Sequence, residues 1–98
     1  MVEVKWTLQA ADDLESITGL IASDSGAYAR LFASDILSAA ERLQQFPNLG
    51  RIVPEVNDTT IRELLLGNYR VIYRVQPDLV EVLTVYHGRR LLDPEQLM

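Results

Sequence analysis

The chain has 98 residues, of which 48% are hydrophobic and 23% charged, with no cysteine and a net charge of −5. A chain of this length forms one modest core, so we expect a single domain over residues 1–98. The composition excludes a disordered chain, the missing cysteines exclude disulfides and thiolate metal sites, and the acidic balance argues against broad electrostatic binding to nucleic acid.

The first half of the chain predicts one strand followed by two helices. Apolar and polar residues alternate over residues 2–6, which indicates a short strand. Thr7 is a candidate N-cap for a helix over residues 8–23, and a second helical stripe runs over residues 27–45. The short break at residues 24–26 predicts an antiparallel helical hairpin.

The second half predicts a long loop followed by three strands. Residues 47–60 contain two prolines and a glycine, and a loop of that length suggests a functional segment. Strand patterns follow at residues 61–65, 69–75 and 79–86, separated by turn residues, and they predict an antiparallel meander. The tail, residues 89–98, is expected to be either a short helix or a disordered end.

These elements predict an α+β fold of two layers with the order β-α-α-β-β-β. The helical hairpin is expected to pack on a small, mainly antiparallel sheet, because each helix has one apolar face to bury. Tyr69 and Tyr73 are expected on the helix-facing side of the second meander strand. Arg70 and Arg74 would then point out of the open face of the sheet.

Three groups of polar residues are candidates for chemistry. Arg70 and Arg74 could be a solvated strand surface or an anion site. His87, the only histidine, could be a general acid–base group or an ordinary structural residue. Glu55 could be a general base, although pairing with Arg51 is the favoured interpretation.

Other site types find no match in the sequence. Metal-binding spacings, phosphate-cradling glycine loops and serine triads are missing, so we expect no metal and no cofactor. Leu20, Leu31 and Leu37 lie off the main helical stripes. They fit a second apolar surface for a partner, or they are ordinary exposed leucines.

Four blocks together resemble the RelE/ParE toxin superfamily of bacterial type II toxin–antitoxin modules. They are Pro47–Glu55, Ile61–Leu64, Gly67–Val75 and Val85–Arg90, and the resemblance covers nearly the whole chain. It implies a RelE-like fold and a growth-inhibiting toxin that a cognate antitoxin neutralises.

The resemblance implies two activities. RelE-type members cut messenger RNA on the ribosome without a metal, whereas ParE-type members poison DNA gyrase. The antitoxin's C-terminal segment folds on the toxin and its N-terminal domain binds operator DNA, so contact with the operator is expected only through the antitoxin. A homodimer or a hetero-tetramer with the antitoxin is the expected assembly.

Residue by residue, the resemblance implies a catalytic set. Arg70 matches the arginine that holds the scissile phosphate, His87 the acid–base histidine, and Glu55 its carboxylate partner. Arg90 or Arg89 matches the cation that stabilises developing charge. Further substrate-binding cations would be Arg74, Arg89 and Arg62. The family's C-terminal catalytic tyrosine is missing, and the helices lack the lysines that grip ribosomal RNA. Phosphate chemistry requires the side chains of Arg70, His87 and Arg90 to converge.

Three hypotheses follow. The chain is a toxin that acts in complex with an antitoxin; it is a metal-independent endoribonuclease; or it is a non-catalytic protein, either a gyrase inhibitor or a degenerate toxin. No apolar run approaches the roughly 18 residues of a membrane span, and the start does not resemble a secretory signal. We therefore expect a cytoplasmic protein without a membrane partner.

Overall fold

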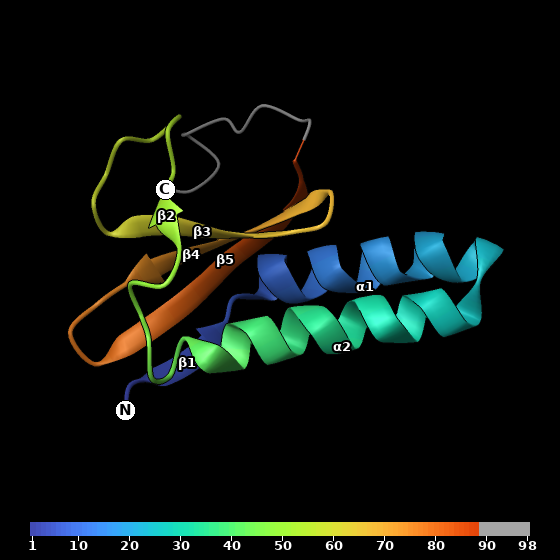
Figure 1. Ribbon diagram of the computed structural model, residues 1–98, viewed down its shortest axis with the longest axis horizontal. Coiled ribbons are helices and arrows are strands. Elements are labelled where there is room, and N and C mark those ends of the chain that lie inside the picture. The colour runs from blue at the N-terminus through green and yellow to red at the C-terminus, as the bar shows by residue number, and fades with distance from the viewer. Residues whose placement is uncertain (89–98) are drawn as a thin grey trace.

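The computed structural model describes residues 1–88 and shows a sheet packed on a helical hairpin (Figure 1). The elements in chain order are β1 (Glu3–Trp6), α1 (Leu8–Asp24), α2 (Gly26–Arg42), β2 (Arg51–Ile52), β3 (Ile61–Leu66), β4 (Tyr69–Val75) and β5 (Leu79–His87). The predicted two-layer α+β fold is confirmed. The tail that was expected to be helical or disordered lies outside the described residues.

Side-chain caps begin both helices, at the predicted Thr7 for α1 and at Ser25 for α2. The Thr7 hydroxyl accepts a hydrogen bond from the Ala10 N–H at 3.0 Å, and Ser25 caps α2 in the same way. The end of α2 differs from the prediction by three residues. The N–H groups of residues 43–45 bond to carbonyls three positions back, so the last turn tightens ahead of Pro47.

The sheet has five strands in the order β1-β5-β4-β3-β2. β1 runs parallel to β5, and all other neighbours are antiparallel. The sequence analysis missed β2, which lies within the predicted loop. β2 has only two residues, Arg51 and Ile52, which pair with Glu63 and Arg62. A strand this short shows no alternation of its own, so only its pairing with β3 reveals it.

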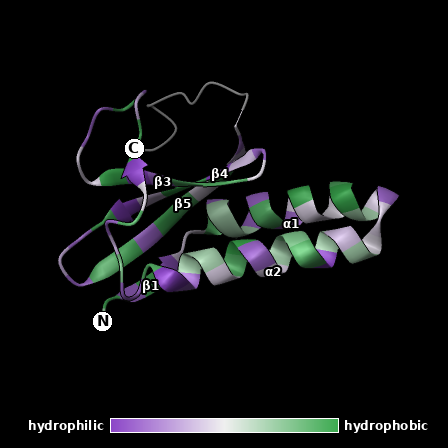
Figure 2. Ribbon diagram, in the orientation of Figure 1, coloured by the Kyte–Doolittle hydropathy of each residue, from purple (hydrophilic) through white to green (hydrophobic). Residues whose placement is uncertain are grey.

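Both faces of the sheet are covered. On the helix side the main core cluster consists of Ala10, Ile36, Ala40, Val71 and Val82, and hydrophobic residues run along both helices (Figure 2). On the far side Val53, Ile61 and Ile72 form a second cluster with Val56 from the loop. The expectation of an open far face is therefore wrong, because the segment after β2 folds back over it.

A β-bulge interrupts the pairing of β4 with β5. Ile72 pairs with Thr84 whereas Tyr73 pairs with Val82, which leaves Leu83 as an extra residue in β5. The bulge is fixed to α1, since the Thr7 hydroxyl donates to the Leu83 carbonyl at 3.0 Å. It reverses the alternation of every later side chain in β5.

Across the described residues, neither helix combines the length and apolar character that crossing a membrane would demand.

Candidate functional site

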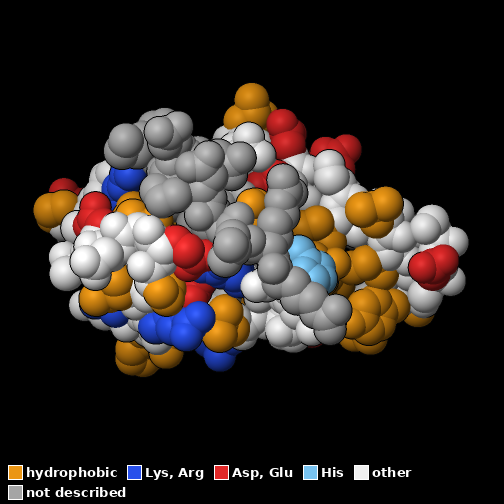
Figure 3. Space-filling view, turned by 90° about the horizontal axis from the view of Figure 1, so that it is seen from above, with side chains coloured by type: hydrophobic (Ala, Val, Ile, Leu, Met, Phe, Trp, Pro, Cys, Tyr) orange, Lys and Arg blue, Asp and Glu red, His pale blue; other side chains and the backbone are white. Residues whose placement is uncertain are grey.

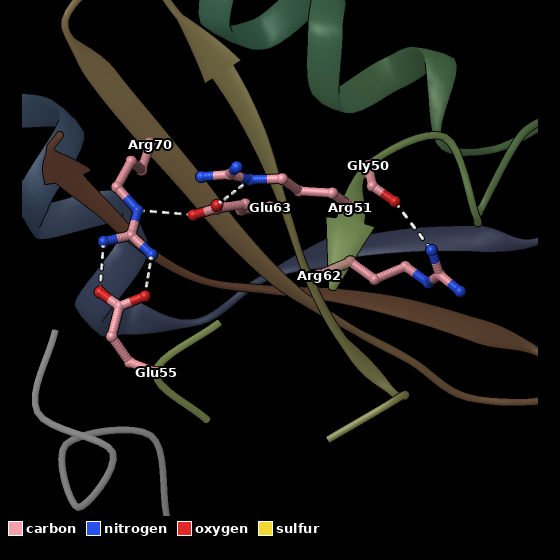
Figure 4. A network of polar contacts seen from close by, with 6 residues as sticks. All are labelled: Gly50, Arg51, Glu55, Arg62, Glu63 and Arg70. Carbon is pink, nitrogen blue, oxygen red and sulfur yellow. Dashed lines mark hydrogen bonds and ion pairs between the residues drawn. The ribbon is translucent and has the colours of Figure 1, made fainter. Parts of the chain in front are cut away.

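Arg70 lies at the centre of a buried ionic network on the far side of the sheet (Figure 4). Its Nη1 and Nη2 donate to the two carboxylate oxygens of Glu55 at 2.7 and 2.9 Å. Its Nε donates to Glu63 at 2.5 Å. Three of the five N–H bonds of the guanidinium are thus directed at two carboxylates, and the Arg70 side chain is only 7% exposed.

Glu63 connects Arg70 to a second arginine, Arg51. One of its oxygens accepts from Arg70 and the other accepts from the Nε of Arg51 at 2.6 Å. The Glu63 side chain is fully buried, whereas that of Arg51 is 59% exposed. Within residues 1–88, the network therefore joins two arginines to two carboxylates.

Three side chains among the described residues have pKa values shifted by their surroundings. Hydrogen bonding to Glu55 raises the pKa of Arg70 and outweighs the opposing effect of burial, with Glu63 adding to the rise. Burial raises the pKa of the Tyr73 hydroxyl above its usual value. At the loop surface, hydrogen bonds from Thr60 lower the pKa of Asp58.

Arg62 belongs to a separate group at the start of the β2 segment. Its Nη1 donates to the Gly50 carbonyl at 2.8 Å, and the Gly50 N–H donates to the buried hydroxyl of Tyr73, also at 2.8 Å. The Nε of Arg62 is buried without a hydrogen-bond partner among the described residues. Arg62 fixes the chain ahead of β2 and faces away from Arg70, since neighbouring strand positions point to opposite faces.

His87 lies on the helix-facing side of the sheet. It pairs with Tyr69, and the two rings are 5.3 Å apart in an edge contact. Tyr69 in turn contacts Phe32 of α2 with ring centroids 4.9 Å apart. Figure 3 shows the histidine beside hydrophobic side chains, whereas acidic and basic side chains lie together in another part of the same view. Among the described residues, the ring contact that places His87 is therefore the one with Tyr69.

The structure brings together some of the predicted site residues and separates others. Arg70 and Glu55 are in direct contact. The expected convergence of Arg70 and His87 is wrong, because Tyr69 and His87 share the helix side and the next residue, Arg70, points to the other. Arg89 and Arg90 lie outside the described residues.

Two further expectations about charges need correction. Among the described residues Arg51 pairs with Glu63 and Glu55 pairs with Arg70, so the favoured Arg51–Glu55 pair is not formed. Arg74, expected to point into solvent, is half-buried opposite Ile61 and Glu81. Both corrections have the same cause, because the segment after β2 covers the far face of the sheet that was expected to be open.

The sequence analysis missed Glu63, the carboxylate on which the network depends. A signal for it existed, because Glu63 shares its strand face with the apolar Ile61 and Leu65. A carboxylate between two apolar residues on a buried face requires a cation nearby. Its position therefore indicated an internal ion pair.

An apolar groove of about 490 Å³ lies between the two helices, close to β1. Trp6 lines it together with Leu14 and Thr18 of α1 and with Ala33 and Leu37 of α2. Leu37 is half exposed, and Leu20 and Leu31 are exposed outside the groove. The three leucines singled out in the sequence are thus surface residues, of which one lines the groove.

Metal binding finds no support within residues 1–88, which contain no cluster of three or more His, Asp or Glu side chains suited to hold an ion.

A family model described as "ParE toxin of type II toxin-antitoxin system, parDE" matches residues 4–92. The chain belongs to the ParE toxin family. Toxin RelE2 of Caulobacter vibrioides is 33% identical over 92 residues, which are 93% of this chain and all of that protein. The putative toxin Y4kP of Sinorhizobium fredii is 35% identical over 89% of this chain and 88% of its own length.

Solved structures agree with membership in the ParE toxin family. A chain from the chromosomal ParDE system of P. aeruginosa is 28% identical with a TM-score of 0.75, covering 89% of this chain and 96% of its own. A chain of the toxin–antitoxin complex RelBE2 from Mycobacterium tuberculosis has a TM-score of 0.63, covering 88% and 96%; its 21% identity supports the fold alone. The predicted RelE/ParE membership and toxin function are confirmed.

Proposed function

We propose that this ParE-family toxin inhibits growth by binding a protein target, DNA gyrase, without cutting RNA. The observation that carries the proposal is the state of Arg70, whose guanidinium is held by two carboxylates on the sheet face opposite His87. General acid–base catalysis at a phosphate requires both groups within hydrogen-bond reach of one substrate. The side chains of Arg70 and His87 leave opposite faces of the sheet, which supports a toxin that does not place both groups on one phosphate.

The charge of the chain supports the same proposal. A ribosome presents many phosphates, and binding to them depends on many Lys and Arg contacts. This chain has one lysine and a net charge of −5. The match to the ParE model favours gyrase over the ribosome among the targets that the resemblance implies.

We also propose a cognate antitoxin as partner, since a solved chain that is 28% identical comes from a ParDE toxin–antitoxin system. The groove between α1 and α2 offers such a partner a mainly apolar surface, in which Glu15 is the charged residue of the lining. A disordered antitoxin segment that folds into the groove would bury its own apolar side chains there. Whether the toxin forms a dimer or a hetero-tetramer with it can be read from the mass of the purified complex.

The test is induced expression with and without the antitoxin, in cells carrying either the wild-type toxin or His87→Ala. We expect both toxins to stop growth, to trap gyrase on cleaved DNA and to leave the 5′ ends of messenger RNA unchanged. Co-expressed antitoxin should restore growth. New messenger RNA ends that disappear in His87→Ala would overturn the proposal in favour of a nuclease.

A further inference from the structure

The second half of β5 has a sequence that fits two registers against β4. In the structure the bulge places Val85 opposite Val71. A continuous ladder through Leu83 would place Thr84 there instead, and every later side chain in β5 would change face. Both faces of the sheet are covered, and Leu83, Val85 and Tyr86 would supply apolar side chains to them in either register. Burial of apolar surface therefore does not by itself select the bulged register.

The register decides the face on which His87 lies. With the bulge in place, His87 pairs with Tyr69 on the helix side, and the side chain of Arg70 leaves the opposite face. In the continuous register Tyr86 would take the place opposite Tyr69, and His87, one residue further, would lie on the face of Arg70. A shift of one residue thus determines whether the single histidine of the chain shares a face with Arg70.

Asp13 of α1 binds β5 directly after the bulge. Its Oδ2 accepts hydrogen bonds from the Thr84 hydroxyl and, at 3.3 Å, from the Val85 N–H. Its Oδ1 accepts from the side-chain amide of Gln9 at 2.7 Å, which orients the carboxylate from within α1. Asp13 is half-buried, and Thr84 and Val85 are buried. Asp13 therefore supplies an acceptor, partly shielded from water, where the bulge interrupts the ladder.

The contacts of Thr7 and of Asp13 fix different sides of the bulge. Thr7 donates to the carbonyls of Val82 and Leu83, both at 3.0 Å, and these residues keep their places in either register. Asp13 instead holds the two residues after the bulge, which would move. The continuous register would carry both donors away from the Oδ2 of Asp13, and a half-buried carboxylate that loses its donors is unfavourable.

The end of β5 favours the bulged register independently of α1. The Gly88 N–H donates to the Asn68 carbonyl at 2.6 Å, and a Cβ atom at Gly88 would lie 3.0 Å from the same oxygen. The continuous register would bring His87 to this position, where its side chain would crowd the turn between β3 and β4. A glycine at position 88 therefore fits the strand only when the bulge is present.

We propose that Asp13 is a positioning residue that selects the register of β5 and thereby holds His87 on the helix side, away from Arg70. A carboxylate on α1 then controls the arrangement of two candidate site residues through its contacts with Thr84 and Val85 alone. The proposal goes beyond the proposed function, because it concerns the register within the toxin itself and holds for either cellular target.

The test reads the register from cross-strand nuclear Overhauser effects (NOEs) in NMR spectra of the purified chain. The wild type should show the backbone NOE between Val71 and Val85. In Asp13→Ala we expect a second set of signals with an NOE between Val71 and Thr84, and hydrogen exchange of the Val85 amide at least ten times faster. Asp12→Ala removes the same charge from the exposed surface of α1 and should match the wild type. Asp13→Asn keeps an acceptor oxygen and should retain the bulged register.

Asp13→Ala with the NOEs and the Val85 exchange rate of the wild type would overturn the proposal. If Asp13→Ala does not fold, Thr84→Val takes its place, because valine has the shape of threonine and removes only the hydroxyl donor. The NOE from Val71 to position 84 should then appear in Thr84→Val. Its absence there would show that Asp13 stabilises the fold without choosing the register, and would equally overturn the proposal.

Discussion

At the scale of single residues, the toxin tolerates buried charges because each buried carboxylate is paired with arginine. Each oxygen of Glu63 and of Glu55 accepts at least one arginine N–H. Removing one member of such a cluster strands its partner in a poorly solvated place, which costs more than the pair contributes when complete. Arg70 is therefore a structural residue that holds β3 and the loop after β2 to β4.

Tyr73 allows a pH-dependent test at the same scale. Its hydroxyl accepts the buried Gly50 N–H, so Tyr73→Phe should lower the free energy of unfolding at pH 7 by about 1–3 kcal/mol. Burial raises the Tyr73 pKa above 10.0, so above that pH the folded chain retains a proton that the unfolded chain loses. The Tyr73 contribution to stability thus falls as pH rises, and the gap between wild type and Tyr73→Phe should shrink.

Urea unfolding between pH 7 and pH 11 measures both effects. Tyr28→Phe is the matched control, because Tyr28 is 60% exposed on α2 and should leave the unfolding free energy unchanged at every pH. A gap between wild type and Tyr73→Phe that stays constant to pH 11 would contradict the assigned pKa direction.

At the scale of elements, the positions of β2 and of the bulge depend on close backbone contacts. A Cβ atom at Gly50 would lie 2.3 Å from the Glu63 carbonyl oxygen and 2.8 Å from the Tyr73 hydroxyl. Only glycine lets the chain approach β3 this closely before β2 begins. The Leu83 bulge is likewise fixed from outside its strand, by Thr7.

Two glycine substitutions should therefore have opposite effects. Gly50→Ala should lower the free energy of unfolding by about 1–3 kcal/mol, because the backbone of β3 must shift. Gly19→Ala should raise it by about 0.5–1 kcal/mol, since a Cβ there meets nothing within 4 Å and alanine favours the helix. Denaturant titration measures the free energy of unfolding of both variants. A change of the same sign in Gly50→Ala and Gly19→Ala would refute the close packing described at Gly50.

At the scale of the whole molecule, the layered arrangement leaves the outer groove of the hairpin uncovered. The sheet covers one side of the helices. The groove lined by Trp6, Leu14 and Leu37 lies between α1 and α2, close to β1. Leu37 and Leu31 are both exposed on α2, but only Leu37 lines the groove. The two leucines therefore separate binding in the groove from general surface hydrophobicity.

Leu37→Asp should weaken the complex with the antitoxin at least tenfold while leaving thermal stability close to that of the wild type. A charge in an apolar interface loses its hydration without gaining a partner. Leu31→Asp, on the same helix, should bind as the wild type does. Calorimetry with the purified antitoxin measures both affinities, and equal losses in the two variants would place the antitoxin elsewhere on the toxin.

The sequence by itself determined the two helices, the strands other than β2, and the superfamily. Alternation over residues 69–75 and the helical stripes are local patterns that any packing of this chain must satisfy. The helix-facing side of β4, with Tyr69 and Tyr73, follows from the same period of two. The match of the family model to residues 4–92 agrees with the motif blocks.

Only the tertiary structure decided which candidate residues meet. Counting by alternation from Val80 and Val82 on the helix side puts His87 on the far side with Arg70, but the extra residue Leu83 reverses the count and turns His87 toward Phe32 and Tyr69. Likewise, Glu55 reaches Arg70 only because its loop folds over the sheet. The bulge depends on a contact with Thr7 at the start of α1, and the path of the loop depends on the second core cluster. Both contacts join residues distant in sequence, so the local sequence pattern does not predict them.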